Sequence, residues 1–232
     1  MPSYLLISGA EAMVVDPGRD ANVYREIAKK EGAAVVAVYL THSHADFVAG
    51  HAELADVAPI YISAKTGAKY DHKPVKEGST LAVGDALVTF LDTPGHTPDG
   101  TCAVVASKQK PGQPLLVFTG DTLFIGSVGR PDLLGEGMAA STLAAMMFDT
   151  WNEKLARLPD DARIFPACCR PSSAGASRSA WNGGRRLVCG PGCCWHWRAA
   201  SSWALPAGWP MAARRARPSV AAPCCSAAAW PS

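Results

Sequence analysis

The chain carries the stretch Thr41-His42-Ser43-His44-Ala45-Asp46 directly after an unbroken apolar run, Val35-Val36-Ala37-Val38-Tyr39-Leu40. The apolar run predicts a strand that is buried on both faces. Histidines at positions i and i+2 point to the same side of an extended segment, so one loop can present both toward one point. Imidazole nitrogens and carboxylate oxygens are ligands of first-row metals such as iron and zinc. The stretch therefore indicates a metal site; the alternative is a solvated polar loop that holds two histidines by chance.

Further apolar runs on both sides of this stretch predict a mixed fold of strands and helices. The predicted strands are residues 3–8, 12–15, 59–62, 81–83, 86–91, 102–106, 115–119 and 163–165, together with 35–40. The predicted helices are residues 21–31, 47–57 and 138–158. Because the strands group at both ends of this region, with helices between and after them, we expect an α+β protein with two sheets covered by helices.

Composition changes sharply after residue 163. Residues 1–163 hold 14 of the 22 Lys and Arg and all 20 Asp and Glu, a net charge of −6, whereas residues 164–232 hold 8 Arg and a net charge of +8. The later segment also holds seven of the eight cysteines and six of the seven tryptophans. We therefore expect one domain over residues 1–167 and a C-terminal tail of anomalous composition over residues 168–232.

Three interpretations of the tail compete. A secreted cysteine-rich module needs disulfides, but no signal peptide opens the chain. A metal knuckle built from Cys189, Cys193, Cys194 and His196 is disfavoured because adjacent cysteines rarely share one tetrahedral site. Out-of-frame translation of GC-rich coding sequence yields Ala, Arg, Pro, Cys and Trp without acids. We favour this third interpretation, in which the tail is frameshifted or disordered.

The basic residues of the tail raise the question of a nucleic-acid or membrane partner. Arg214, Arg215 and Arg217 cluster among tryptophans, but no recognisable binding module accompanies them. No run of eighteen apolar residues is present, so we expect no transmembrane helix. We expect a cytoplasmic protein without nucleic-acid or membrane partners, and we leave a homo-oligomer open.

Two further predicted strands end in ligand-type residues. His96 follows strand 86–91 within Thr93-Pro94-Gly95-His96-Thr97, and Asp121 follows strand 115–119 within Gly120-Asp121-Thr122. Loops at strand ends are where rigid scaffolds hold catalytic groups. Two neutral imidazoles and one carboxylate make the facial triad of non-haem iron(II), which leaves positions open for substrate and dioxygen. The three strand ends together predict a metal centre.

These motifs resemble the successive motifs of the metallo-β-lactamase superfamily. The matching stretches are residues 41–46, 93–97 and Thr119-Gly-Asp-Thr-Leu-Phe124. Residues 120–132 and 44–51 are similar to the glyoxalase II-like persulfide dioxygenases, which include enzymes fused to rhodanese domains. The resemblance covers residues 3–167 and implies an αββα sandwich with one iron at the sheet edge. The implied reaction is oxidation of glutathione persulfide, or a similar low-molecular-weight persulfide, by dioxygen to sulfite and thiol.

The resemblance also implies roles for individual residues. His42, His96 and Asp121 match the catalytic iron ligands. His44 and Asp46 match positions that bind metal in two-zinc hydrolases. In the dioxygenases, residues at these positions support the metal ligands and do not bind the metal themselves.

Arg130 is a candidate for binding a substrate carboxylate. Its alternative is an ion pair with Asp132 that fixes the loop.

Phe47 bears on the number of metal ions. Enzymes of the glyoxalase II type carry at this position a histidine that binds the second metal, and a phenyl ring offers no lone pair. A two-metal site also requires a histidine late in the chain, but beyond Asp121 the chain has only His196. We therefore expect one Fe(II) per chain. The alternatives are a zinc-dependent thioester hydrolase of the glyoxalase II type and an inactive remnant of the fold.

The two ends of the domain depart from the family pattern. Family members usually have another strand before residues 3–8, so we expect a truncated start. Pro166-Ala167 is followed by Cys168-Cys169-Arg170, where the family continues with His-Gly. Because the helices that would follow are lost, we expect a poorly soluble or partly folded protein unless the tail packs against the domain.

Overall fold

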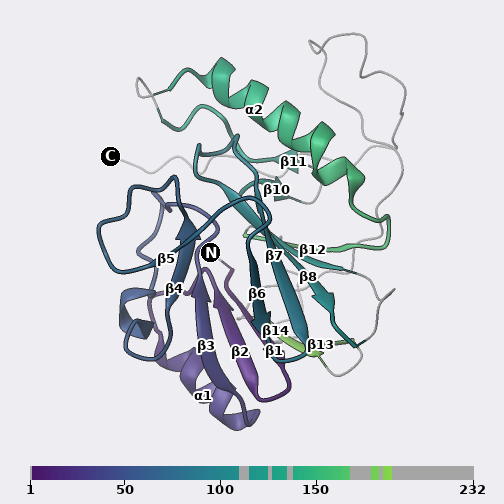
Figure 1. Ribbon diagram of the computed structural model, residues 1–232. Coiled ribbons are helices and arrows are strands. Elements are labelled where there is room, and N and C mark those ends of the chain that lie inside the picture. The colour runs from purple at the N-terminus through teal and green to yellow at the C-terminus, as the bar shows by residue number, and fades with distance from the viewer. Residues whose placement is uncertain are drawn as a thin grey trace, which may run out of the picture.

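Two β-sheets pack face to face, and helices lie on their outer faces (Figure 1). The structure is a computed structural model that describes residues 2–109, 115–124, 127–134, 138–167, 179–182 and 185–189. The arrangement confirms the predicted αββα sandwich and the α+β class. It follows from the sequence pattern because each strand that is apolar on both faces needs one face against the other sheet and one against a helix.

The first sheet has seven strands in the order β13-β14-β1-β2-β3-β4-β5. Its strands are β1 (Tyr4–Ser8), β2 (Glu11–Val15), β3 (Ala34–Tyr39), β4 (Ile60–Ser63), β5 (Lys73–Val75), β13 (Ser179–Asn182) and β14 (Arg185–Cys189). Strands β1 and β2 form an antiparallel hairpin, whereas β2, β3, β4 and β5 run parallel. The parallel strands all end at one edge of the sheet, where the His42 loop lies.

The second sheet has five strands in the order β12-β9-β8-β7-β6. Its strands are β6 (Thr80–Val83), β7 (Ala86–Asp92), β8 (Thr101–Ser107), β9 (Leu116–Gly120) and β12 (Arg163–Pro166). A small ribbon of β10 (Leu123–Phe124) and β11 (Ser127–Val128) follows β9. Because β8 is antiparallel to both β7 and β9, the strands β7 and β9 run in the same direction and end at the same edge.

Helix α1 (Asn22–Lys30) covers the outer face of the first sheet. Its buried residues, Tyr24 and Ala28, lie one turn apart and therefore share one face. Lys29 and Lys30 lie in the last turn, where the helix dipole favours positive charge.

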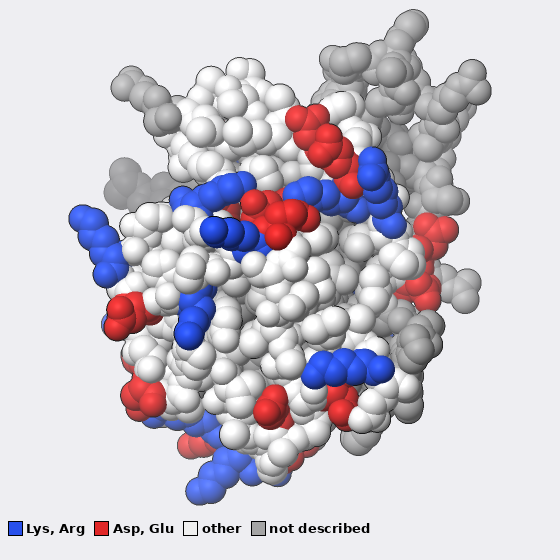
Figure 2. Space-filling model, viewed as in Figure 1, with Lys and Arg blue, Asp and Glu red and all other residues white. Residues whose placement is uncertain are grey.

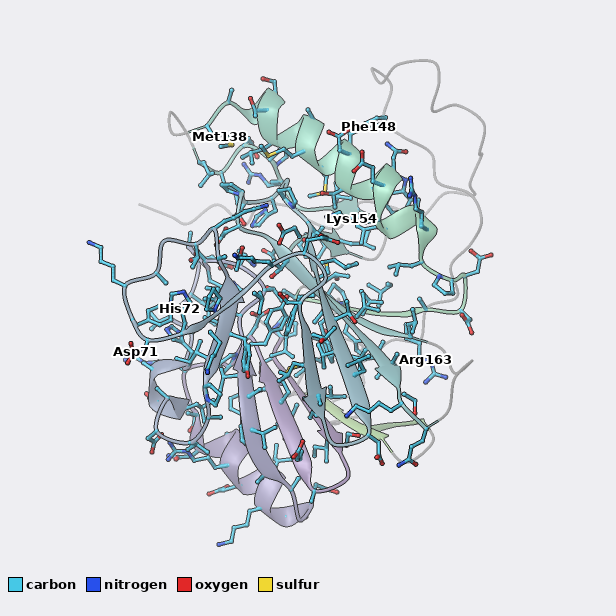
Figure 3. All side chains as sticks on the ribbon, in the orientation of Figure 1. Asp71, His72, Met138, Phe148, Lys154 and Arg163 are labelled. Carbon is cyan, nitrogen blue, oxygen red and sulfur yellow. The ribbon has the colours of Figure 1, made fainter. Side chains whose placement is uncertain are left out.

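Helix α2 (Ala140–Glu153) is followed by the short 3₁₀ turn η3 (Leu155–Arg157). Leu155 packs with Trp151 in the cluster on the outer face of the second sheet. Lys154 connects the end of the helix to that sheet (Figure 3), because its Nζ donates to the carbonyl of Asp92 at 2.6 Å and pairs with Glu77 at 2.5 Å. Acidic and basic side chains lie side by side in the band below α2 (Figure 2).

The core between the sheets is aromatic and aliphatic. Tyr4 lies at 5.4 Å from Phe118 and 5.6 Å from Phe165, measured between ring centroids, and Tyr39 lies at 4.9 Å from Phe90. All five side chains are buried. These pairs join the two sheets directly below the edge that carries the His42 loop.

The helix predicted over residues 47–57 is wrong. The structure has only the 3₁₀ turn η1 (Ala52–Leu54) in this region. The N–H of Gly50 donates to the carbonyl of Pro17 at 2.9 Å, and a Cβ on Gly50 would lie 2.2 Å from the carbonyl oxygen of Gly18. A tertiary contact with another loop therefore takes the backbone bond that a helix would use.

The tail contributes β13 and β14, and β14 pairs antiparallel with β1. The rest of residues 168–232 lies outside the described residues, so the frameshift and the disorder of the tail stay predictions. Within the described ranges, we find no helix with the length and apolar character needed to cross a membrane.

Candidate metal centre

Three loops bring His42, His96 and Asp121 together. They follow β3, β7 and β9, which end at the same side of the sandwich, and their ligand atoms lie within 4.8 Å of one another. His42 and His96 are buried, and Asp121 is half-buried. The arrangement places the two imidazoles and the carboxylate predicted from the three strand ends at one point.

His42 is oriented by a hydrogen bond at the back of its ring. Thr41 Oγ1 donates its one proton to Asp16 Oδ2 at 2.8 Å, so the contact of 3.0 Å between Thr41 Oγ1 and His42 Nδ1 makes Nδ1 the donor. This tautomer leaves the Nε2 lone pair free. Burial lowers the pKa of His42 to about 4, so that the ring is neutral at pH 7, as a metal ligand must be.

His96 has the same tautomer. Its Nδ1 donates to the carbonyl of Arg130 at 3.0 Å, and its Nε2 lies 3.4 Å from Asp121 Oδ2. Asp121 Oδ1 is buried without a hydrogen-bond partner, and burial raises the pKa of this carboxyl group. Two free imidazole lone pairs and an unpaired carboxylate oxygen at one point are unfavourable by themselves, and a divalent cation satisfies all three. The residues present therefore fit a metal ion.

Two glycines permit the close approach of the ligand loops. A Cβ on Gly120, whose φ is +48°, would lie 2.3 Å from Thr41 Oγ1. A Cβ on Gly129 would lie 1.9 Å from the carbonyl oxygen of Asp121 and 2.7 Å from the Cβ of His96. Any side chain at either position would separate the ligands.

Asp16 supports both histidines of the first loop. It is buried, and its carboxylate accepts the Thr41 N–H and the Thr41 hydroxyl at 2.8 Å and the His44 Nε2–H at 2.9 Å. Burial opposes its ionisation, but the charge and hydrogen bond of His44, together with His42 and the Thr41 N–H, outweigh burial and lower the pKa of Asp16. Its φ of +46° is unusual for a residue other than glycine, a conformation that aspartate tolerates better than most.

His44 and Asp46 lie outside the three-residue cluster. Because His44 Nε2 is bonded to Asp16, only its Nδ1 remains available, and that atom is buried without a partner. The His44 ring lies 4.4 Å from the ring of Phe47. Asp46 is exposed, and its charge contributes to raising the pKa values of His44 and Asp121. Among the described residues, the cluster of His42, His96 and Asp121 is the one group of three that could hold a metal.

Arg130 forms the ion pair with Asp132 that the sequence predicts as the alternative to substrate binding. Its Nε and Nη2 each lie 3.0 Å from a carboxylate oxygen of Asp132, and its side chain is 71% exposed. Its backbone carbonyl, by contrast, holds His96. Binding of a substrate carboxylate by the guanidinium group stays a prediction.

Sequence reasoning missed Asp16 and Asp99 as site residues. Asp99 is buried, and its Oδ2 accepts the Ser43 N–H at 2.9 Å and the Ser43 hydroxyl at 2.6 Å. Burial would raise the pKa of Asp99, but the hydrogen bonds from Ser43 help to lower it. Their positions in the chain were the available signal, since Asp16 directly follows the predicted strand 12–15 and Asp99 lies three residues after His96.

A cavity of about 340 Å³ adjoins the cluster. Its walls include His42, Ser43, His44, Phe47, Val48 and Tyr70. The volume lies at the lower end of the range of small-molecule sites. Because His42 of the metal cluster forms part of its wall, a molecule in the cavity lies beside the metal centre.

Comparison with known proteins agrees with this geometry. Residues 2–167 match the metallo-beta-lactamase superfamily. A hydroxyacylglutathione hydrolase from Cupriavidus metallidurans is 37% identical over 170 residues, which cover 68% of this chain and 59% of that protein. The chain thus spans about three fifths of the length of this curated relative.

Two solved structures have similar folds. A metallo-beta-lactamase from Staphylococcus aureus subsp. aureus COL has a TM-score of 0.62 and 34% identity, over 68% of this chain and 48% of that one. ETHE1 from Myxococcus xanthus has a TM-score of 0.60 and 27% identity, over 71% of this chain and 69% of that one. With the family match over residues 2–167, these likenesses show that the chain belongs to the metallo-beta-lactamase superfamily.

Proposed function

We propose that this protein is an iron-dependent persulfide dioxygenase. The reaction converts glutathione persulfide or a similar low-molecular-weight persulfide, with dioxygen and water, into the thiol, sulfite and two protons. The observation that carries the proposal is the cluster of two imidazoles and one carboxylate, since this set is the facial triad of non-haem iron(II). The fold of ETHE1, a persulfide dioxygenase, supports the same assignment.

Phe47 supports one metal ion rather than two. Its ring lies against His44 at 4.4 Å between centroids, where a second ion would need a further ligand. A phenyl ring has no lone pair, and His44 Nε2 is already bonded to Asp16. One iron per chain therefore suits the side chains around the cluster better than a pair of zinc ions.

The chain's own residues bind and orient the reactants. His42, His96 and Asp121 would hold an iron(II) ion, which would supply Lewis-acid and redox chemistry toward a persulfide sulfur and dioxygen. The Thr41 hydroxyl and the Arg130 carbonyl fix the two imidazoles so that each Nε2 faces the centre. The cavity beside them receives the thiol carrier, and the Phe47 side chain supplies an apolar part of its wall.

A zinc-dependent thioester hydrolase is the second candidate. It is favoured by the 37% identity to a hydroxyacylglutathione hydrolase. In this reaction the same three residues would hold a zinc ion, which would supply the chemistry that activates a water for hydrolysis. The two candidates differ in metal identity, in metal stoichiometry and in the need for dioxygen.

The deciding experiment measures metal content and both activities on the full chain purified without oxygen. We expect about one iron per chain, dioxygen uptake that requires glutathione persulfide, and sulfite as product. His96→Ala should abolish both metal retention and uptake. His72→Ala should leave both unchanged, because His72 lies outside the cluster in an exposed loop (Figure 3). About two zinc ions and hydrolysis of a hydroxyacylglutathione would establish the second candidate, and absence of metal and of both activities would indicate an inactive remnant.

A further inference from the structure

Asp99 connects the loop of His42 with the loop of His96. It lies three residues after His96, and its Oδ2 accepts both the backbone N–H and the hydroxyl of Ser43 at 2.9 and 2.6 Å. Ser43 is the residue between His42 and His44. The Asp99 side chain therefore holds the histidine loop of the first sheet from the ligand loop of the second sheet.

The hydrogen-bond chain continues into a third loop. The Ser43 hydroxyl donates its one proton to Asp99, so in the contact of 2.6 Å with Thr66 it is the acceptor, and the Thr66 hydroxyl is the donor. Thr66 follows β4 and lines the cavity beside the metal centre. A buried carboxylate thus ends a chain of two hydroxyl groups, which is the direction that charge-assisted bonds favour.

A second connection lies closer to the strands. The carbonyl of Thr41 accepts the Thr101 N–H at 2.8 Å and the Thr101 hydroxyl at 2.9 Å. His42 thus lies between a residue held by Thr101 and a residue held by Asp99. Without the Asp99 contacts, the backbone on the Ser43 side of His42 loses its bond to the loop of His96, whereas Thr41 on the other side stays bonded to Thr101 and Asp16.

We propose that Asp99 is a positioning residue that sets the metal affinity of the centre by holding Ser43, and with it His42, at a fixed distance from His96. The proposal rests on the metal centre of the proposed function and not on the reaction that the metal performs. Removal of the carboxylate leaves the Ser43 N–H and hydroxyl without their acceptor. Loss of such a supporting contact weakens metal binding about 10- to 100-fold in comparable sites.

The test measures the zinc dissociation constant of the metal-free full chain by competition with a chromophoric chelator. We expect Asp99→Ala to raise the constant about 10- to 100-fold. Asp99→Asn should stay within about threefold of the unsubstituted chain, because the amide oxygen accepts the same two bonds. The zinc dissociation constant of Ser43→Ala should lie between those of Asp99→Asn and Asp99→Ala, because the backbone N–H of residue 43 still donates to Asp99. The visible spectrum of bound cobalt should change in Asp99→Ala and return in Asp99→Asn.

The matched control is Asp85→Ala, which removes a carboxylate from the turn at the far end of β7, where it accepts a bond from Gln109. Its zinc affinity should not change. The proposal is overturned if Asp99→Ala binds zinc as tightly as the unsubstituted chain, or if Asp99→Asn loses as much affinity as Asp99→Ala. Should Asp99→Ala fail to fold, Ser43→Ala decides, and an unchanged zinc constant in that variant rejects the proposal. A chain that shows the Asp99 effect but oxidises no persulfide contradicts only the proposed function.

Discussion

His42 is a buried imidazole that folding keeps neutral. Its ring is enclosed at the end of β3, and its Nδ1–H is used by Thr41. Burial disfavours the imidazolium form, and the neighbouring His44 adds to this effect, so that the pKa falls from 6.5 to about 4. Because the unfolded chain binds this proton much more readily than the folded chain, the group makes folding depend on pH.

We expect the metal-free protein to lose stability as the pH falls from about 6.5 to about 4. In this window the unfolded chain takes up a proton at His42 and the folded chain does not, so the free energy of unfolding decreases on acidification. A pKa difference of this size corresponds to about 3 kcal/mol. Urea denaturation at a series of pH values measures the slope.

The control for this pH effect is His42→Gln, which has no titrating group at the site. Its unfolding free energy should vary less over the same window, and an equal slope in both proteins would refute the assignment to His42.

His44 contributes to the pH dependence of stability in a different pH range. Burial lowers its pKa, but Asp16, with Asp121 and Asp46, raises it more, so the stability that His44 contributes is present below about pH 6.5 and is lost as the pH rises through the higher folded pKa.

At the scale of elements, α2 packs on the loop that carries His96. The Thr150 hydroxyl of the helix donates to the carbonyl of Pro94 at 2.8 Å. A Cβ on Gly95, whose φ is +147°, would lie 2.6 Å from the Cβ and 2.7 Å from the Cα of Met147. The helix backbone therefore touches the residue before His96, and the position of the helix determines the position of this ligand.

We expect Gly95→Ala to lower the free energy of unfolding by about 2 to 4 kcal/mol, because the added methyl group meets the backbone of α2 and the φ value suits only glycine. Zinc affinity should fall as well, since His96 moves with Gly95. Urea denaturation and chelator competition measure the two effects.

Gly32→Ala is the comparison for Gly95→Ala. Gly32 also has a positive φ, +69°, but nothing lies within 4 Å of its Cβ position. Its substitution should cost about 1 kcal/mol and leave zinc binding unchanged. Equal losses in the two variants would mean that contact with α2 contributes nothing.

Most elements were predictable because their cause is local. The strand at residues 35–40 and the helix at residues 21–31 follow from apolar runs, helix periodicity and glycine stops, and the structure has β3 and α1 there. The helix predicted over residues 47–57 failed because Gly50 bonds to Pro17, a contact that local sequence does not reveal. Long-range contacts override local preference in such loops.

The residues of the site likewise divide into those that local sequence reveals and those that depend on long-range contacts. His42, His96 and Asp121 were identifiable because each ligand-type residue lies in the loop that follows a strand, one to four residues after the strand ends. Asp16 and Asp99 were not, because their importance depends on which loop lies opposite. An aspartate beside a glycine or proline predicts a turn as readily as it predicts a contact with a distant serine.

At the scale of the whole molecule, the metal centre joins two sheets. His42 comes from the end of β3 in the first sheet, whereas His96 and Asp121 come from β7 and β9 in the second. An ion that binds all three stabilises the folded state relative to the unfolded chain, where the ligands are far apart.

We expect metal to raise the thermal midpoint of unfolding. Free metal at 100 times its dissociation constant should add about 2.7 kcal/mol to the free energy of unfolding. Asp121→Ala should show a much smaller shift under the same conditions, since it leaves two ligands. Scanning calorimetry with and without zinc measures both, and identical shifts in the two proteins would place the bound ion elsewhere.

The division of the ligands between the two sheets also makes the metal a reporter of assembly. An ion is captured only by chains in which β3 has docked opposite β7 and β9, a step that joins residues nearly 80 positions apart, from His42 to Asp121. When metal is supplied in excess of its dissociation constant, the molar ratio of bound metal to polypeptide then measures the correctly assembled fraction. A ratio well below one under these conditions, with intact ligands, measures molecules in which the two sheets have not docked.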